Sequence, residues 1–354
     1  MPDCNDPGFD INKIVHGGDV YRNRVLLDYS VNLNPLAMPG SVTEASLSGL
    51  GEMHQYPDPY QVELRKAIGC YEDIDSGNIV CGNGASELIM AAVHAFRPRT
   101  ALITAPCYAG YARALMASDT EVTEYALDEN RGFLLDHSFL ECLDENIDMV
   151  FLADPNNPNG AVIDQVLKEK IIEKCADKGI VLLLDECFLP LTGINEAKAT
   201  ERGCVLHLRA FTKTFAIPGI RIGYLYSDNT DALELIRLHL PEWNVSRIAE
   251  RTGTEAAKIL SDTEYLRDSV LMIRREREYL SHELKQLGIR VYPSDVNYLL
   301  LKSDVDLYHR LLERGVLVRR CANFSGLSDS FIRIAVRSHE DNLHFIEILK
   351  TVLK

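Results

Sequence analysis

The sequence lacks an excess of basic residues, a paired-cysteine motif and a long apolar run. Its 37 lysines and arginines are outnumbered by 52 aspartates and glutamates, which gives a formal net charge of −15. A surface for nucleic acid or anionic membrane needs clustered positive charge, so the composition argues against both as general partners. No apolar run approaches the ~20 residues of a membrane span. A local cluster of arginines can still bind a small anionic substrate.

Nine cysteines are scattered through the 354 residues, and none forms a CxxC pair. Metal-ligand spacings such as HExxH are also absent, so we predict no metal site. The start MPDCNDPGFD is polar and unlike a secretory leader. Together with the odd number of cysteines, this predicts a reduced, cytoplasmic protein.

The length predicts about two domains. Residues 1–45 are turn-rich, with Leu26–Val31 as a short extended candidate, and we expect an N-terminal arm that joins the small domain and the substrate site. Residues 46–240 should form a large domain. Residues 241–354 should form an interdomain helix, near Asp262–Leu287, and a small C-terminal α+β domain with strands at Val291–Lys302 and Phe331–Val336.

Short apolar runs alternate with helical patterns through the large domain. Because these runs are apolar on both faces, they indicate an α/β fold with a mainly parallel sheet and helices on both faces. The predicted strands are Ile79–Cys81, Thr100–Thr104, Met149–Ala153, Ile180–Leu184 and Val205–Arg209.

Polar or small residues follow these strands, where ligands gather in such sheets. Gly82–Ser86 opens a helix whose N–H groups can bind a phosphate, although a tight turn is an equally ordinary explanation. Tyr108 follows the next strand and could be a packing residue. Asn156, Asn157 and Asn159 lie in a turn that they commonly serve themselves.

Two charged side chains at this edge are harder to explain as structural residues. Asp185 ends an aliphatic strand, where a carboxylate is costly unless it meets a cation. Lys213 lies in FTKTFAIPGIRIGY among apolar residues, and desolvation would lower its pKa toward the neutral amine. A lysine at the rim of a strand is the alternative. Arg221 follows in the same stretch.

A phosphate cradle, an aromatic ring, a buried acid, a desolvated lysine and an arginine form the set that a pyridoxal-phosphate enzyme requires. The lysine amine holds the cofactor aldehyde covalently. The aspartate keeps the pyridine nitrogen protonated, so that the ring can accept the electrons of a carbanion. The glycine-rich turn and the arginine bind the cofactor phosphate, and the aromatic ring covers the pyridine face.

In order and spacing, GNGASE, PCYAGY, NNPNG, LLLDEC and FTKTFAIPGIRIGY resemble the fold-type I aminotransferases of class I/II over nearly the whole chain. The resemblance implies that Lys213 is the Schiff-base lysine, that Asp185 pairs with the pyridinium, and that Tyr108 stacks on the ring. Asn157 would bind the phenolic oxygen. Tyr56, in HQYPDP, would reach the cofactor phosphate of a neighbouring subunit, which implies a homodimer with shared active sites. The residues implied for the phosphate are Gly84, Ala85, Ser86, Thr212 and Arg221.

Within this superfamily the sequence resembles the threonine-phosphate decarboxylases of cobalamin synthesis and the histidinol-phosphate aminotransferases. HGG before DYSVNLNPL, RRCANFSGL, FIRIAVR and Phe188 are more similar to the decarboxylases. This implies decarboxylation of L-threonine O-3-phosphate to (R)-1-aminopropan-2-yl phosphate. Transamination between histidinol phosphate and 2-oxoglutarate is the main alternative. A non-catalytic regulatory module ranks lower, because such modules normally carry a DNA-binding domain and only about 45 residues precede the core.

The resemblance also implies residues for a phosphorylated amino-acid substrate, and Asn157 is one of them. Arg333 resembles the arginine that binds the substrate carboxylate. Arg337, four residues along the predicted strand, could face the same way about 13 Å further on, or form a surface ion pair. His16 could bind phosphate or end a turn. Asn32 and Asn34 could contact substrate or hold an irregular loop.

Three positions depart from the pattern of the relatives. Ala210 stands where a serine or threonine often contacts the phosphate, so one hydroxyl is missing. Arg320 stands where an acid is common, which changes the charge near the substrate entrance. Asp154 replaces the usual asparagine.

Overall fold

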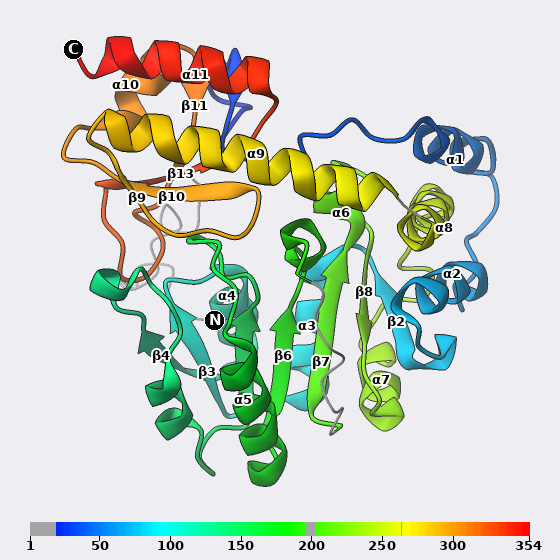
Figure 1. Cartoon of the computed structure of the whole chain (residues 1–354). Coiled ribbons are helices and arrows are strands. Elements are labelled where there is room, and N and C mark those ends of the chain that lie inside the picture. The colour runs from blue at the N-terminus through cyan, green and yellow to red at the C-terminus, as the bar shows by residue number, and fades with distance from the viewer. Residues whose placement is uncertain (1–18, 195–202, 263) are drawn as a thin grey trace, which may run out of the picture.

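A seven-stranded sheet forms the centre of the larger part of the molecule (Figure 1). The computed structural model describes residues 19–194, 203–262 and 264–354. The sheet order is β2-β8-β7-β6-β5-β3-β4, and β8 alone among these seven runs antiparallel to its neighbours. Its strands are β2 (Ile79–Gly82), β3 (Thr100–Ala105), β4 (Glu121–Ala126), β5 (Met149–Ala153), β6 (Val181–Asp185), β7 (Val205–Ala210) and β8 (Gly223–Tyr226).

Helices cover both faces of this sheet. The helices of the chain are α1 (Gly40–Gly51), α2 (Val62–Glu72), α3 (Ala85–Phe96), α4 (Gly110–Met116), α5 (Gln165–Lys178), α6 (Phe211–Thr214), α7 (Thr230–Arg237), α8 (Arg247–Ser261), α9 (Glu264–Gln286), α10 (Leu307–Glu313) and α11 (His339–Val352). Helices α3, α4 and α7 pack on one face of the sheet. Helix α5 packs on the other face, where α2 and α8 cover β2 and β8. The predicted α/β fold with a mainly parallel sheet is confirmed.

The sequence of β6 explains why both faces need helices. Successive side chains of a strand point to opposite faces. Leu183 therefore packs with α3 and α4, whereas Leu182 and Leu184 pack with α5. The same alternation places Asp185 on the face of Leu183, at the carboxyl end of the strand.

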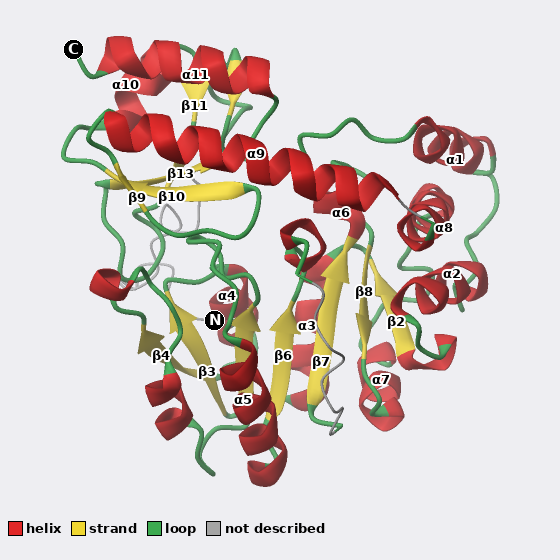
Figure 2. Cartoon of the chain, in the orientation of Figure 1, coloured by secondary structure: helices red, strands yellow, loops and turns green. Residues whose placement is uncertain are grey.

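A second, four-stranded antiparallel sheet lies in the C-terminal part, in the order β12-β13-β10-β9 (Figure 2). Its strands are β9 (Arg290–Val291), β10 (Tyr298–Lys302), β12 (Arg319–Arg320) and β13 (Phe331–Ala335). The N-terminal strand β1 (Leu27–Asp28) pairs with β11 (Val316–Leu317) in the same region. The long helix α9 packs its start against the core of the larger sheet and its end against the C-terminal core. The smaller α+β part was predicted, and the exact domain boundaries stay predictions.

Two features of the sheets differ from the sequence-based expectation. The predicted strand Val291–Lys302 is a hairpin of β9 and β10, because the Ser294 hydroxyl donates to the Tyr298 carbonyl and turns the chain between them. The sequence interpretation missed strands β4 and β8. Strand β4 is largely exposed, so its residues lack the apolar run of the other strands. Strand β8 begins within the stretch FTKTFAIPGIRIGY, which was interpreted for Arg221.

The described helices include none with the length and apolar character to cross a bilayer. Within the same residue ranges, no group of three or more His, Cys, Asp or Glu side chains could hold a metal ion. The predicted substrate residue His16, in HGG, lies outside the described residues.

Candidate active site

Small residues bring an arginine against the N-terminus of α3. Gly84 precedes this helix with φ of +78°, in the left-handed region that favours glycine. A Cβ there would overlap Arg221 Nη2, and a Cβ on Gly223 would lie 3.0 Å from the Ala85 nitrogen. Glycine at position 84 therefore lets the guanidinium pack directly against the start of the helix, and glycine at position 223 lets β8 approach the Ala85 nitrogen. Helix N–H groups beside an arginine form an anion-binding cradle.

The short helix α6 begins beside this cradle and carries Thr212 and Lys213. Ala210 occupies its N-cap and supplies no side-chain hydrogen bond. The substitution noted in the sequence therefore removes a hydroxyl from the start of a helix, where one would satisfy a free N–H. Thr212 is buried in the same turn, and its hydroxyl is the one that remains on this side.

Asp185 is held at the end of β6 by two donors. Its Oδ2 accepts a hydrogen bond from Tyr111 of α4 at 2.7 Å, and its Oδ1 accepts from the Cys187 nitrogen at 3.1 Å. Burial raises the pKa of Asp185, while the hydrogen bonds from Cys187 and Tyr111 oppose that rise. Such a carboxylate gains most from a cationic partner, which a protonated pyridine nitrogen would supply.

Tyr111 was not identified from the sequence, although it stands three residues after Tyr108 in PCYAGY. Its ring meets Tyr108 edge to face, with 5.4 Å between centroids, and stacks on Phe151. Tyr111 thus contacts both the predicted stacking ring and the predicted pyridine partner. Only the folded path of α4 brings these groups together.

Lys213 is half-buried, and its Nζ lies 5.5 Å from the centre of the Phe188 ring. Burial lowers the pKa of Lys213 to about 8, and the positive charge of Arg333 acts in the same direction. About a tenth of the amine is therefore unprotonated at neutral pH, one unit below this pKa, and the neutral amine is the form that a nucleophilic lysine requires.

The asparagines of NNPNG divide into two kinds. Asn156 and Asn159 are buried and serve the turn: Asn156 donates to Asn159 Oδ1 at 2.8 Å, and Asn159 donates to the Phe133 carbonyl at 3.0 Å. Asn157 instead accepts a hydrogen bond from Arg333. The departure at Asp154 is matched by Lys168, because the two form a buried ion pair.

Arg333 reaches from β13 to the residues that follow the larger sheet. It is buried, and Nη2 donates to the Ser30 carbonyl at 3.1 Å. With its amide oxygen turned toward Arg333, Asn32 accepts from Nε at 3.1 Å. Arg333, Asn32 and Asn157 therefore lie together, as the resemblance implied for substrate.

Arg319 is a second buried arginine that the sequence interpretation missed. It is the register partner of Arg333 across β12 and β13, so both side chains project from the same face. Burial lowers the pKa of Arg319 to about 10, with Arg333 as the second cause. Within the described part of the chain, neither guanidinium forms an ion pair with a carboxylate. The sequence interpretation singled out the neighbouring Arg320 instead, because the strand register that pairs Arg319 with Arg333 is not visible in the sequence.

Two other arginines differ from expectation. Strand β13 ends at Ala335, so the regular strand does not extend to Arg337, and a role of Arg337 in substrate binding stays a prediction. Arg337 forms the alternative ion pair, with Asp341 at 3.0 Å. Arg320 pairs with Asp329 at 2.7 Å, which compensates its charge at the surface.

Tyr56 and Asn34 lie in different surroundings. Tyr56 is 78% exposed and packs on Trp243, with 4.8 Å between ring centroids. Its predicted contact is with another subunit and stays a prediction. Asn34 is buried and bonds to the backbone of the Lys213 turn. The structure thus places Asn34 in the loop-holding alternative.

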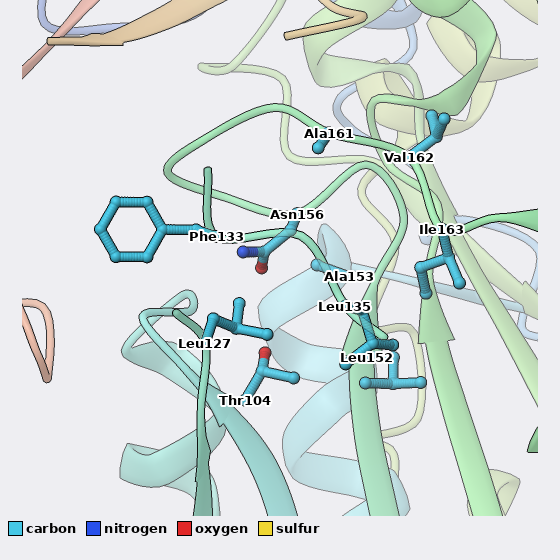
Figure 3. A pocket seen from close by; sticks show the side chains of 10 residues that line it. All are labelled: Thr104, Leu127, Phe133, Leu135, Leu152, Ala153, Asn156, Ala161, Val162 and Ile163. Carbon is cyan, nitrogen blue, oxygen red and sulfur yellow. The ribbon is translucent and has the colours of Figure 1, made fainter. Parts of the chain in front are cut away.

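A small cavity lies behind the NNPNG turn (Figure 3). Its volume is about 20 Å³, and apolar side chains line it together with Thr104 and Asn156. That is room for about one water molecule. The residues that line it do not include Lys213 or Asp185, so this cavity is separate from the predicted cofactor site.

The arrangement fits pyridoxal phosphate. The Arg221 guanidinium against the start of α3 suits a phosphate, and Asp185 lacks a cationic partner among the contacts described above. Lys213 supplies an amine of lowered pKa. An anion, a basic ring nitrogen and an aldehyde are the three groups that these residues would complement.

Comparisons with known proteins agree with this arrangement. Residues 24–349 match the family model for aminotransferase class I and II. The chain is 35% identical to the threonine-phosphate decarboxylase of Salmonella typhimurium over 93% of this chain and 91% of the relative. It is 31% identical to a histidinol-phosphate aminotransferase of Caldanaerobacter subterraneus over 92% of this chain and 93% of that relative. The crystal structure of the histidinol-phosphate aminotransferase from Clostridium acetobutylicum superposes with a TM-score of 0.84 at 34% identity, covering 93% of this chain and 99% of that one.

Proposed function

Since the chain belongs to the class I and class II aminotransferase family and is a pyridoxal-phosphate-dependent enzyme, we propose that it decarboxylates L-threonine O-3-phosphate to (R)-1-aminopropan-2-yl phosphate. The product would serve cobalamin biosynthesis. The proposal is supported by the similarity to the Salmonella typhimurium decarboxylase and by the decarboxylase-like motifs around Phe188, RRCANFSGL and FIRIAVR.

The paired buried arginines carry the proposal. Arg319 and Arg333 are 4% and 5% exposed, stand opposite each other, and lack a carboxylate partner in the described ranges. Burying two like charges side by side is unfavourable unless an anion joins them. Threonine phosphate carries its carboxylate on Cα and its phosphate on the oxygen of the adjacent Cβ, so each arginine would bind one anionic group.

The cofactor would be held by residues at the edge of the larger sheet. Lys213 would bind its aldehyde, Asp185 its ring nitrogen and Asn157 its phenolic oxygen, while Tyr108 would cover the ring. Gly84, Ala85, Ser86, Thr212 and Arg221 would hold its phosphate. When bound, pyridoxal phosphate accepts the electron pair of the bond that breaks at Cα.

Lys213 would move a proton in this reaction. In the decarboxylation, the bond from Cα to the carboxylate breaks, carbon dioxide leaves, and a proton takes its place on Cα. An amine with a pKa of about 8 can carry that proton at neutral pH. Phe188, whose ring faces the amine, has no group that could exchange a proton. It would instead exclude water from the amine.

A histidinol-phosphate aminotransferase is the second candidate. The superposition on the Clostridium acetobutylicum enzyme supports it, and the two arginines could bind the two carboxylates of 2-oxoglutarate in place of the two anionic groups of threonine phosphate. The Cα–H bond would then break instead of the Cα–carboxylate bond. The outcome would depend on which of these two bonds at Cα the protein orients for cleavage.

Product analysis separates the two candidates. The enzyme is incubated with threonine phosphate alone, and separately with histidinol phosphate and 2-oxoglutarate. We expect carbon dioxide in the first reaction without any keto acid, because a proton replaces the carboxylate on Cα and no amino group is transferred to an acceptor. Rapid glutamate formation without carbon dioxide would replace the decarboxylase with the aminotransferase. Lys213→Ala should abolish either product and is the control for contaminating activity.

We also propose a cytoplasmic homodimer in which Tyr56 serves the neighbouring site. Exposed apolar side chains occur on and after α1, and Tyr56 among them packs on Trp243: Leu47, Leu50, Met53, Tyr56 and Tyr60. Exposed apolar groups of this kind commonly become buried between subunits. Mixing Tyr56→Ala with Lys213→Ala subunits tests this, since only a shared site would leave one intact centre per mixed dimer. A monomer by light scattering would contradict the proposal.

A further inference from the structure

We propose that Asn34 is a positioning residue for Lys213: its amide fixes the Lys213–Thr214 turn against α9 and does not contact substrate. This inference rests on the assignment of Lys213 as the lysine that binds the cofactor. It concerns the geometry of that lysine and is independent of which substrate the enzyme uses.

The Asn34 side chain has all of its polar atoms engaged within the protein. Its two amide N–H groups face three oxygens: the Thr214 carbonyl at 2.8 Å, the Ser269 hydroxyl at 2.8 Å and the Tyr265 hydroxyl at 3.1 Å. Its carbonyl oxygen accepts from the Leu36 nitrogen at 3.0 Å. The residue is 5% exposed. A side chain so fully bonded has no donor left for a substrate.

The same residue also holds the Lys213 backbone. The Asn34 nitrogen donates to the Lys213 carbonyl at 3.0 Å. Helix α6 has only four residues, so most of its carbonyls have no partner inside the helix. Asn34 satisfies two consecutive carbonyls of this turn, those of Lys213 and Thr214. The N-terminal arm thereby supplies hydrogen-bond donors that a further turn of helix α6 would otherwise supply.

Helix α9 provides the fixed surface for this connection. The Tyr265 hydroxyl donates to the Thr214 carbonyl at 3.1 Å, and its ring stacks on Phe215 with 5.1 Å between centroids. The Ser269 hydroxyl donates to the Tyr265 carbonyl, which leaves its oxygen free to accept from Asn34. Arm, lysine turn and α9 are therefore joined through one amide.

Asn32, two residues earlier, has a different environment. Its side chain bonds to Arg333 rather than to the lysine turn. The two asparagines of DYSVNLNPL thus serve opposite sides of the same site. Asn32 belongs to the anion-binding arginines, and Asn34 belongs to the lysine.

The test compares cofactor binding by Asn34→Ala and wild-type enzyme without substrate. Apoenzyme is titrated with pyridoxal phosphate, and the rate of attachment to Lys213 is followed against pH. We expect the dissociation constant to rise about tenfold, as for the loss of one to two net hydrogen bonds. The pH midpoint of attachment should rise above that of wild type, because a looser turn exposes the amine to water and burial is the main cause of its lowered pKa.

Two further variants make the result interpretable. Asn229→Ala is the matched control, since Asn229 caps α7 with a bond to the Ala232 nitrogen at 3.0 Å and donates to the Gly203 carbonyl at 2.9 Å, away from the lysine turn. It should leave both readouts at wild-type values. Tyr265→Phe retains Asn34 and removes one hydroxyl, so it should shift both readouts in the same direction by less.

Wild-type cofactor affinity and pH midpoint in Asn34→Ala, or equal changes in Asn229→Ala, would overturn the proposal. If Asn34→Ala fails to fold, Tyr265→Phe alone tests the proposal, and a wild-type pH midpoint of cofactor attachment in Tyr265→Phe would contradict it. Failure of the cofactor assignment is distinguishable, because Lys213→Ala would then bind pyridoxal phosphate as tightly as wild type and borohydride would attach it elsewhere.

Discussion

Replacing Arg319 by glutamine should stabilise the empty enzyme and impair substrate binding at the same time. Burial first and the charge of Arg333 second lower the pKa of Arg319 from its usual range to about 10. Since a tenfold change in a protonation equilibrium is ~1.4 kcal/mol, the charged guanidinium carries about 3 kcal/mol of unfavourable free energy. A buried glutamine retains part of the desolvation cost. We therefore expect Arg319→Gln to raise the free energy of unfolding by about 1–2 kcal/mol.

The effect on substrate has the opposite sign. A hydrogen bond to a charged group contributes about 1.5–3 kcal/mol, so losing it should raise KM by ~10–100-fold. Cofactor affinity should change little, because the residues assigned to the cofactor do not include Arg319. Melting curves without ligand and KM measurements on the active substrate give the two values. Added inorganic phosphate should raise the melting temperature of wild type more than that of the variant.

Arg320→Gln is the matched control, because Arg320 adjoins Arg319 in β12 but forms an ion pair with Asp329. An exposed ion pair contributes ~0–1 kcal/mol, so this variant should be unchanged or slightly less stable, with normal KM. A less stable Arg319→Gln with normal KM would refute the reasoning. Arg319 would then be a structural residue.

Three further predictions concern the lysine, the aspartate and the contact between the two sheets. Attachment of pyridoxal phosphate to Lys213 should slow about tenfold per pH unit below the pKa of about 8 and level off above it, because the amine must lose its proton. A rate that stays constant over the first pH units below that pKa would contradict this. Asp185→Asn should retain cofactor and lose ~10²-fold or more in turnover, and near-normal turnover would make Asp185 structural. Glu129→Gln should lower the melting temperature, because the Glu129 carboxylate binds three partners: Lys302 at 2.8 Å, Arg290 at 3.0 Å and the Tyr292 hydroxyl at 2.7 Å. Glu145→Gln is its control, because it removes only one exposed ion pair, with Lys178.

The sequence was most informative for site residues whose position depends only on the strand that precedes them. The apolar run before Asp185 predicts a strand buried on both faces, and the strand end then places the carboxylate at the ligand edge. The same logic located Tyr108, Asn157 and Lys213 near that edge. These residues follow their strands directly, so no long-range register was needed.

It was least informative where two distant segments must meet. Arg319 and Arg333 become neighbours only through the pairing of β12 with β13, and Arg337 meets Asp341 only because α11 begins shortly after β13. The motif left Asn34 open to substrate contact or to holding a loop, and its amide is used by Thr214, Tyr265 and Ser269. A motif identifies a segment, whereas the surrounding fold decides which side chain of that segment faces the ligand.

The charge of the site illustrates the same distinction. The chain carries a net charge of −15, yet Lys213, Arg221, Arg319 and Arg333 outnumber Asp185 around the site. A dianionic cofactor and a dianionic substrate would together balance this local excess. Because buried charges interact more strongly than exposed ones, the few internal cations dominate the field that a ligand meets. The net negative charge of the chain and the cationic residues of the site are therefore compatible, because the net charge sums over the whole chain whereas a bound ligand meets the local charges first.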